Sequence, residues 1–252
     1  IIIAIYKDYK SLDVVLKSLE KQSYSFFEVV IAEDCMCLEL EKIRLEYPLL
    51  KINHVKQEDI GFRKNKVLNK AIKIAEGEYL IFLDGDCFVH SKFVEAYNEL
   101  FEENILLVGR RVMLSQGLTD RIKNKFFIPS FFDILFSKSN HKEEGIRLPL
   151  KFSRKNINGL IGSNFGIDKK LLLKINGFDE DYEAPGVGED DDIYMRLKKA
   201  GDVKFKSIRN RAIQYHLEHS RKKLENENTK LFNEKKKRIS FRCLNGLEKL
   251  EE

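Results

Sequence analysis

The segment EYLIFLDGDCFVH, residues 78–90, decides how the rest of this sequence is interpreted. Its first half is largely apolar, as in a buried β-strand, and it leads into two aspartates, Asp84 and Asp86, that flank one glycine. Two carboxylates at the end of a buried strand are energetically unfavourable unless a cation lies beside them. Because carboxylate oxygens suit a hard divalent cation, the segment indicates a Mg²⁺ or Mn²⁺ site.

Strand and helix patterns alternate through the first hundred residues around this segment. Four apolar strands are expected, with the sequences IIIAIY, FEVVIAED, KINHV and EYLIFLD. A helical pattern follows each strand: residues 11–22 after the first, a helix that ends near residue 48 after the second, residues 62–76 after the third and residues 91–102 after the fourth. Four such units predict an α/β fold with a mostly parallel, Rossmann-like sheet and helices on both faces. Ligands bind beyond the carboxyl ends of strands in such sheets, so we expect Asp34 and Asp84 to meet in one crevice.

The regular alternation ends near residue 104. Further strands are expected at 104–114, 160–167 and 202–215, and helices at 168–175 and at 189–200, the last of these ended by Gly201. Residues 115–158 mix aromatic, basic and proline residues, and we expect a helical insert packed on the sheet. Within it, FFIPSFFDILF (126–136) has the basic neighbours Arg121, Lys123 and Lys125, so a flap that contacts a membrane surface or an acceptor is the alternative.

The composition is that of a globular protein, with 43% hydrophobic residues and a formal net charge of +5. Much of the basic excess lies in residues 235–238, and residues 221–252 predict a charged helical or disordered tail. A local basic run is weaker evidence for nucleic-acid binding than a basic stripe across the fold, so no nucleic-acid partner is expected.

The cysteines and the apolar runs bear on where the protein acts. Its four cysteines show no paired spacing and no secretory signal precedes them, which favours reduced thiols in the cytoplasm. No apolar run reaches the roughly 18 residues that a membrane-spanning helix needs. The chain begins at Ile1, inside an apparent strand and without a Met, so an upstream segment that includes an anchor stays an open alternative.

A second acidic cluster, GEDDDIYMRL, opens the helix expected from residue 189. Carboxylates at a helix N-terminus gain from the helix dipole, which explains part of this cluster as a structural feature. Four in a row exceed what capping needs, and like charges raise one another's pKa. One of them can therefore serve as a general base.

Two of the five histidines, His216 and His219, lie close together in the segment YHLEHSR. For histidines in general, a surface pair is the more frequent explanation. Imidazole nitrogens also bind Mn²⁺, and zinc is disfavoured here because no cysteine pair accompanies them.

The order of these motifs resembles the family-2 glycosyltransferases of the GT-A fold. The motifs are VVIAEDC, GFRKNKVLNKAI, GEYLIFLDGDC, GSNFGIDKKLLLKINGFDE, GEDDDIYMRL and HLEHS, and the second half is similar to the β-1,4-galactosyltransferase and chondroitin-polymerase branch. The resemblance covers about residues 1–220. It implies a GT-A domain with a nucleotide-binding half, 1–103, and an acceptor-binding half, 104–220, before a helical C-terminal extension.

The resemblance implies roles for the residues that match the family's motifs. Donor contacts are expected from Asp34, Phe62, Lys64 and Asp84. Asp86 and His219 match metal ligands, and His216 occupies the spacing of a further ligand. The expected cofactor is Mn²⁺, or Mg²⁺.

The acceptor side follows from the GEDDD segment. Asp190 matches the general base that takes a proton from the acceptor hydroxyl, and Glu189 and Asp191 match acceptor contacts. The implied reaction is inverting transfer of a sugar from a UDP-sugar donor to a glycan or lipid-linked acceptor. The enzyme would be cytoplasmic, with peripheral contact at the inner face of the membrane, and would serve polysaccharide biosynthesis.

The sequence departs from the family pattern at two places. The usual P-x-Y-N after the first strand is replaced by AIYKDY, and the tryptophan that commonly precedes the acidic motif is absent because the chain has no Trp. Acceptor stacking is therefore expected to involve another ring, such as Tyr182.

Three other interpretations compete with glycosyl transfer. A nicotinamide-dependent dehydrogenase is disfavoured because no G-x-G-x-x-G follows the first strand. A phosphotransferase with an aspartyl nucleophile could also use DGD at a strand end. A non-enzymatic module that binds a membrane or nucleic acid through its basic tail is the third.

Overall fold

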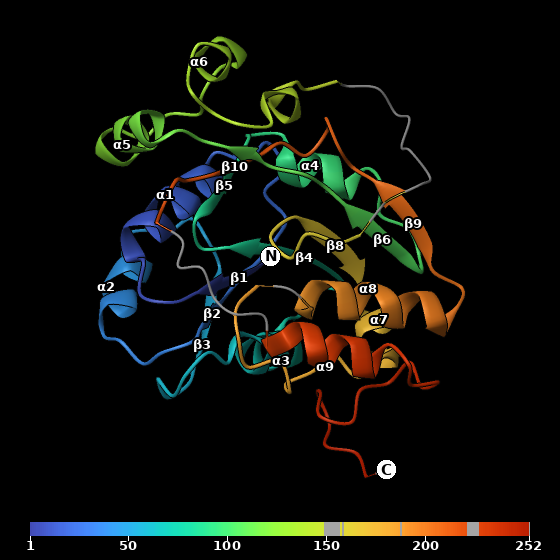
Figure 1. Cartoon of the computed structure of the whole chain (residues 1–252). Helices are drawn as coiled ribbons and strands as arrows, with labels where there is room; N and C mark the ends of the chain where they lie inside the picture. Colours follow the sequence, from blue (N-terminus) through green and yellow to red (C-terminus); the bar gives the residue numbers. More distant parts are fainter. Residues whose placement is uncertain (149–156, 158, 187, 221–226, 252) are drawn as a thin grey trace.

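The computed structural model of the 252-residue chain describes residues 1–148, 157, 159–186, 188–220 and 227–251. Within these residues a seven-stranded sheet in the order β3-β2-β1-β4-β8-β6-β9 has helices on both faces (Figure 1). Its strands are β1 (Ile2–Ile5), β2 (Val29–Glu33), β3 (Ile52–Lys56), β4 (Tyr79–Asp84), β6 (Ile105–Val108), β8 (Phe165–Asp168) and β9 (Lys204–Ser207).

The first four strands are parallel, as the sequence predicts. Successive residues of a strand point to opposite faces, and both faces of β1 are apolar because helices cover each of them. Ile3 and Ile5 pack in one core cluster with α1, whereas Ile2 and Ala4 pack in the other with α3. This arrangement confirms the predicted α/β fold and places the ends of β1, β2 and β4 at one edge.

The helices follow the sequence patterns with shorter bounds in places. They are α1 (Tyr9–Glu20), α2 (Glu39–Leu45), α3 (Lys64–Ile74), α4 (Phe93–Asn98), α5 (Gln116–Asn124), α6 (Phe131–Leu135), α7 (Lys169–Lys174), α8 (Glu189–Ala200) and α9 (Glu227–Lys235). Helix α8 has the predicted bounds because Gly201, with φ of 67°, adopts a conformation that favours glycine and ends the helix. None of the helices in the described part of the chain combines the length and apolar character that a bilayer span requires.

Strand β8 differs from the expected strand at 160–167 in length and direction. It begins only at Phe165, and it runs antiparallel to both β4 and β6, between which it lies. The residues before it form a turn instead of a strand. The sheet is therefore mixed in its second half, and the turn lies at the same edge as the end of β4.

The strands expected at 104–114 and 202–215 are each divided between two sheets. In the first segment, β6 joins the large sheet and β7 (Val112–Met113) joins a small one. In the second segment, β9 joins the large sheet and β10 (Gln214–His216) joins the small one. The small sheet has the order β5-β10-β7, where β5 is Cys87–Val89. Because His216 pairs with Cys87 in this sheet, its ring lies beside the residue that follows Asp86.

The insert at 115–158 contains α5, α6 and a 3₁₀ helix, η1 (Lys142–Gly145), so its helical character is as predicted as far as residue 148. Residues 149–156 and 158 lie outside the described residues. Ile122 and Ile134 are fully buried in the core cluster that also contains side chains of α1 and α4. The insert is thus fixed to the body of the protein by one apolar face.

The C-terminal segment is not simply the solvated tail that its composition suggests. Helix α9 lies against the body of the protein (Figure 1), and its Lys235 is buried against Asp179. Farther on, Leu247 joins the core cluster that covers α3 and α7. Residues 221–226 lie outside the described residues, so the expectation for them is not tested.

Candidate active site

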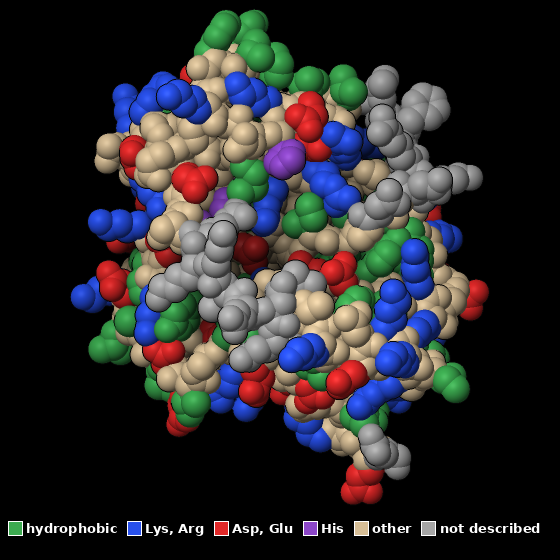
Figure 2. All heavy atoms as spheres, in the orientation of Figure 1, with side chains coloured by type: hydrophobic (Ala, Val, Ile, Leu, Met, Phe, Trp, Pro, Cys, Tyr) green, Lys and Arg blue, Asp and Glu red, His purple; other side chains and the backbone are tan. Residues whose placement is uncertain are grey.

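The ends of β4, α3 and α8 meet around the ammonium group of Lys64. Lys64 Nζ lies 3.0 Å from Asp84 Oδ1 and 3.3 Å from Glu189 Oε1, although Glu189 is 125 residues away in the sequence. Burial by itself lowers the pKa of Lys64, but the negative charges of Asp84, Glu189 and Asp190 outweigh it and hold the pKa well above its usual value. Figure 2 shows acidic side chains at the floor of a hollow in the middle of one face.

Asp34 lies at the same edge, but both oxygens of its carboxylate have partners within the protein. Oδ1 accepts a hydrogen bond from Gln57 Nε2 at 2.6 Å, and Oδ2 accepts one from the backbone N–H of Arg63 at 2.8 Å. These bonds hold the start of α3, where Phe62 is half-buried. Asp34 therefore positions the segment that carries Lys64.

Asp86, two residues after Asp84, lies against the imidazole rings of His216 and His219. Its Oδ2 is 3.1 Å from Nε2 of His219 and 3.5 Å from Nε2 of His216. Burial favours the neutral acid, but the hydrogen bond from His219 and the charge of His216 outweigh it, so the pKa of Asp86 is held below its usual value. A carboxylate and two imidazoles fit a Mn²⁺ ion by the chemistry of their donor atoms.

Cys87 also lies within reach of a metal bound at Asp86 and His216, since their potential ligand atoms fall within 4.8 Å of one another. However, burial, together with the charges of Asp86 and Asp84, raises the pKa of the Cys87 thiol well above its usual value. A neutral thiol is a poor ligand for a hard cation. The carboxylate–imidazole set of Asp86, His216 and His219 is therefore the better candidate metal site.

Asp190 is held at the start of α8 by the turn that precedes β8. Its Oδ2 accepts a hydrogen bond from the backbone N–H of Gly162 at 2.8 Å. A Cβ atom at position 162 would overlap the Asp190 carboxylate, so this approach requires a glycine. Burial and the charge of Glu189 raise the pKa of Asp190 to about 7, although Lys64 and the Gly162 hydrogen bond act in the opposite direction.

The four carboxylates at the start of α8 have different surroundings. Glu189 is buried beside Lys64, and its Oε2 has no hydrogen-bond partner among the described residues. Asp191 is half-buried near Gly159. Asp192 points inward and forms an ion pair of 2.7 Å with Arg196, which in turn donates to two backbone carbonyls. The cluster thus combines an internal structural carboxylate, Asp192, with Glu189 and Asp190, whose charges act on Lys64, and with the half-buried Asp191.

Sequence reasoning missed Arg111 and Gly162. The Arg111 guanidinium lies 3.9 Å from Asp84 Oδ2 and donates a hydrogen bond of 2.8 Å to Ser163 Oγ. Two consecutive arginines directly after a buried strand were the available signal for Arg111. The available signal for Gly162 was a Gly-Ser pair just before a strand.

The structure corrects the expectation for Tyr182. Its ring is only 1% exposed and lies under the ammonium group of Lys235, 5.4 Å from the ring centroid. A ring in this position cannot stack on an acceptor, so Tyr182 is a core residue.

Known structures share this fold. A structure of S. aureus TarS 1-349 in complex with UDP-GlcNAc aligns with a TM-score of 0.61 at 20% identity, over 88% of this chain and 58% of that one. A structure of GalNAc-T7 with UDP, GalNAc and Mn²⁺ aligns with a TM-score of 0.62 at 15% identity, over 86% and 43%. The molecule therefore has the GT-A fold of nucleotide-sugar-dependent glycosyltransferases, as the sequence resemblance implied.

Sequence comparison gives the family. The profile of Glycosyl transferase family 2 matches residues 1–175, and that of the N-terminal domain of galactosyltransferase matches residues 148–220. The chain belongs to glycosyl transferase family 2. It is 28% identical over 238 residues to chondroitin synthase of Escherichia coli. That alignment covers 86% of this chain but only about a third (34%) of the chondroitin synthase. The enzyme class is thus glycosyltransferase, in preference to the phosphotransferase and the binding module.

Proposed function

We propose that this protein is an inverting, metal-dependent glycosyltransferase that moves a sugar from a UDP-sugar to a hydroxyl group of an acceptor. The observation that carries the proposal is that Lys64 joins the strand-end carboxylate Asp84 to Glu189, whose neighbour Asp190 has a pKa raised to about 7. A carboxylate with a pKa near neutrality is suited to accept a proton, and a cationic side chain between the two groups suits a site for a charged donor.

On the donor side, Phe62, Lys64 and Asp84 would contact the nucleotide, and Asp34 would do so through a carboxylate oxygen that accepts a second hydrogen bond beside the one from Gln57 or Arg63. Lys64 and Arg111 supply positive charge beside Asp84, where a diphosphate would be attracted. Asp86, His219 and His216 would hold a divalent ion, Mn²⁺ or Mg²⁺. When bound, this ion would offset the negative charge of the diphosphate leaving group. Support comes from the relatives of this fold, which include proteins solved with UDP-GlcNAc and with Mn²⁺.

On the acceptor side, Asp190 would take the proton of the attacking hydroxyl. Glu189 and Asp191 would orient this hydroxyl by accepting hydrogen bonds from the acceptor, and Glu189 Oε2, which has no partner among the described residues, suits that role. Attack from the face opposite the leaving group is a single displacement and inverts the configuration at the anomeric carbon. Proton removal by Asp190 makes the hydroxyl oxygen a stronger nucleophile as the new bond forms.

The acceptor proposed is a glycan or a lipid-linked glycan of a polysaccharide pathway. The similarity to a chondroitin synthase supports a glycan acceptor. A lipid-linked acceptor would bring a cytoplasmic enzyme to the inner face of the membrane, so peripheral membrane contact is part of the proposal.

The test is UDP release by the purified protein with a panel of UDP-sugars, with Mn²⁺ and with a chelator. We expect release from one sugar class only, dependent on the ion, and metal-dependent UDP binding that Asp86→Ala weakens. His141→Ala replaces an exposed histidine outside the site and serves as the control. Metal-independent UDP binding, or equal binding by Asp86→Ala, would overturn the metal assignment. Absence of release with every nucleotide sugar and acceptor would count against the function.

A further inference from the structure

Helix α6 projects from the body of the protein and carries an exposed apolar surface (Figure 1). Four side chains, which we call the α6 tip, form it: Phe131, Phe132, Leu135 and Phe136, with exposed fractions of 38%, 66%, 41% and 83%. In Figure 2 the α6 region, at the top, ends in hydrophobic side chains. Large apolar side chains concentrated on one exposed projection indicate a contact site.

The α6 tip is held in a defined conformation. Ser130 and Asp133 form a capping box in which the Ser130 N–H donates to Asp133 and the Asp133 N–H donates to Ser130. Ile134, on the opposite side of the helix, is fully buried and anchors α6 in the core. The rings of Phe132 and Phe136 stack with centroids 6.4 Å apart. The exposure of the tip is therefore a property of the fold and does not arise from fraying.

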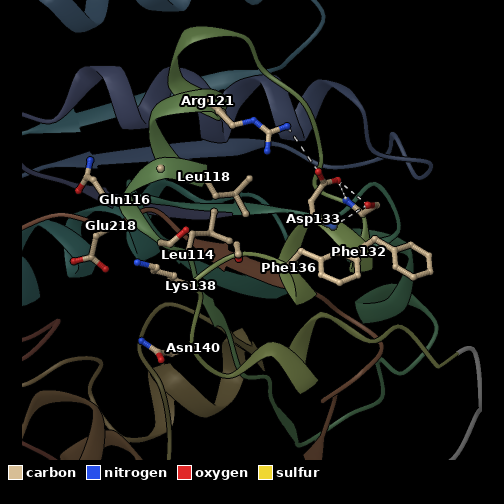
Figure 3. Close-up of a pocket in the computed structure, with 14 residues that line it drawn as sticks. Leu114, Gln116, Leu118, Arg121, Phe132, Asp133, Phe136, Lys138, Asn140 and Glu218 are labelled. Carbon is tan, nitrogen blue, oxygen red and sulfur yellow. Dashed lines mark hydrogen bonds and ion pairs between the residues drawn. The ribbon is translucent and has the colours of Figure 1, made fainter.

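Basic and amide side chains lie next to the tip. An open pocket of about 830 Å³ between α5 and α6 is lined by Gln116, Arg121, Lys138 and Asn140 on its polar side, and by Phe132 and Phe136 at its apolar end (Figure 3). Asp133, the acidic residue of α6, is partly compensated because its Oδ1 lies 3.8 Å from Arg121. Lys125 and Lys138 are exposed. Two basic side chains, Arg121 and Lys138, thus line the same pocket as Phe132 and Phe136, together with the carboxylates of Asp133 and Glu218.

The size and shape of the tip favour a lipid surface over a rigid protein partner. Its four side chains expose roughly 450 Å² if each has a full area of about 200 Å². A stable protein–protein interface needs about 800 Å² from each partner. A small convex projection with aromatic rings and flanking cations has the composition of a segment that lies in the interfacial region of an anionic bilayer.

We propose that the α6 tip is a membrane-docking site that inserts its apolar side chains into the interface of an anionic lipid bilayer. In the docked state Arg121 and Lys138, which line the pocket beside the tip, lie at the level of the headgroups. The pocket also includes Glu218, the residue before His219, so docking places the candidate active site close to the lipid surface. This last consequence rests on the proposed function, whereas lipid binding itself does not.

The test is sedimentation of the full chain with vesicles of neutral lipid and with vesicles that contain an anionic phospholipid. We expect binding to the anionic vesicles that weakens at high salt, because surface charge attraction is screened. The double variant Phe132→Ser/Phe136→Ser should bind at least about tenfold more weakly, since most of the inserted apolar area is lost. The matched control is Leu45→Ser/Leu49→Ser, which removes two apolar side chains of 83% and 85% exposure near α2.

Three results would overturn the proposal. They are the failure of the wild-type protein to bind anionic vesicles, equal binding by the tip variant, and a concentration-dependent dimer that the tip variant abolishes, which would assign the tip to a second copy of the chain. UDP release with a water-soluble acceptor should be unchanged in the tip variant. Failure of membrane docking is therefore distinguishable from failure of the proposed transferase activity.

Discussion

Lys64 at the start of α3 and Glu189 at the start of α8 form a 3.3 Å ion pair that connects the two halves of the protein. The same ammonium group lies 3.0 Å from Asp84 at the end of β4. One cation therefore lies between a carboxylate of the expected donor side and a carboxylate next to the proposed base. Changes at Lys64 should consequently affect proton transfer at Asp190 as well as donor binding.

The first prediction concerns the pH dependence of transfer. If Asp190 is the base, kcat/KM should rise as pH increases through about 7, because the carboxylate must lose its proton to act. The charge of Lys64 lowers the pKa of Asp190, so Lys64→Met should move the midpoint to higher pH. Lys64→Arg, which keeps the charge, should leave the midpoint near that of the wild type. An identical midpoint in Lys64→Met would show that Lys64 does not act on the catalytic titration.

The second prediction is that Asp190→Asn keeps UDP binding and loses transfer by about 10²- to 10⁴-fold, the usual contribution of a general base. Its stability should also change with pH. A carboxylate whose pKa is raised in the folded state stabilises the protein fully only below its unfolded pKa, and this contribution is lost as pH rises through about 7. The Asn variant should therefore gain in Tm relative to the wild type between pH 6 and 8.

Asp202→Asn is the control for this variant, because it removes an exposed carboxylate just beyond the other end of α8. It should leave transfer unchanged and show no such trend in Tm. Full transfer by Asp190→Asn would remove the base assignment.

The third prediction tests how the turn before β8 holds Asp190. In Gly162→Ala, the added methyl group would overlap the Asp190 carboxylate and displace it from its hydrogen bond with the residue 162 N–H. Transfer should fall by about tenfold or more, because small displacements of a catalytic group are costly. Gly117→Ala is the control, since a Cβ at that position in α5 meets no atom of the described residues within 4 Å. Equal kcat/KM for the two variants would argue against a positioning role for the turn.

Local pattern predicted much of the first half of the fold but less of the second. Alternating apolar strands and amphipathic helices are local signals, so β1 to β4 and the bounds of α8 could be read from the sequence. The direction of β8 depends on its pairing with β4 and β6, which no local pattern records. The division of residues 202–215 into β9 and β10 is likewise decided by which sheet offers partners to each part.

The candidate site shows the same limit. The motifs indicated Asp84, Asp86 and Asp190 because carboxylates at strand and helix ends are visible in the sequence. Arg111 and Gly162 contribute only through tertiary contacts with Asp84 and Asp190. A charged composition also suggested a solvated C-terminal segment, since composition does not reveal that one of its lysines is buried against the buried Asp179.

The last prediction concerns that lysine, Lys235. It is 6% exposed and forms ion pairs with Asp179, which is 3% exposed, and with Asp181 at 2.6 Å. Burial favours the neutral form of Asp181, but the hydrogen bonds from Lys235 and Asn245 outweigh it and lower its pKa. Lys235→Met would leave Asp179 buried without its cation, and we expect a loss of about 3 kcal/mol in the free energy of unfolding, measured with urea. Limited proteolysis should then cut residues 227–251 faster.

Lys237→Met is the control for this variant, because Lys237 is an exposed lysine of the same basic run, and its unfolding free energy should stay within about 0.5 kcal/mol of the wild type. Asp179→Asn in the Lys235→Met background should restore part of the loss, since it removes the uncompensated charge. If the loss arose only from the missing aliphatic packing of Lys235, the double variant would be no more stable than Lys235→Met. Recovery would therefore show that the buried charge pair between Lys235 and Asp179 holds the C-terminal segment against the segment that connects α7 and α8.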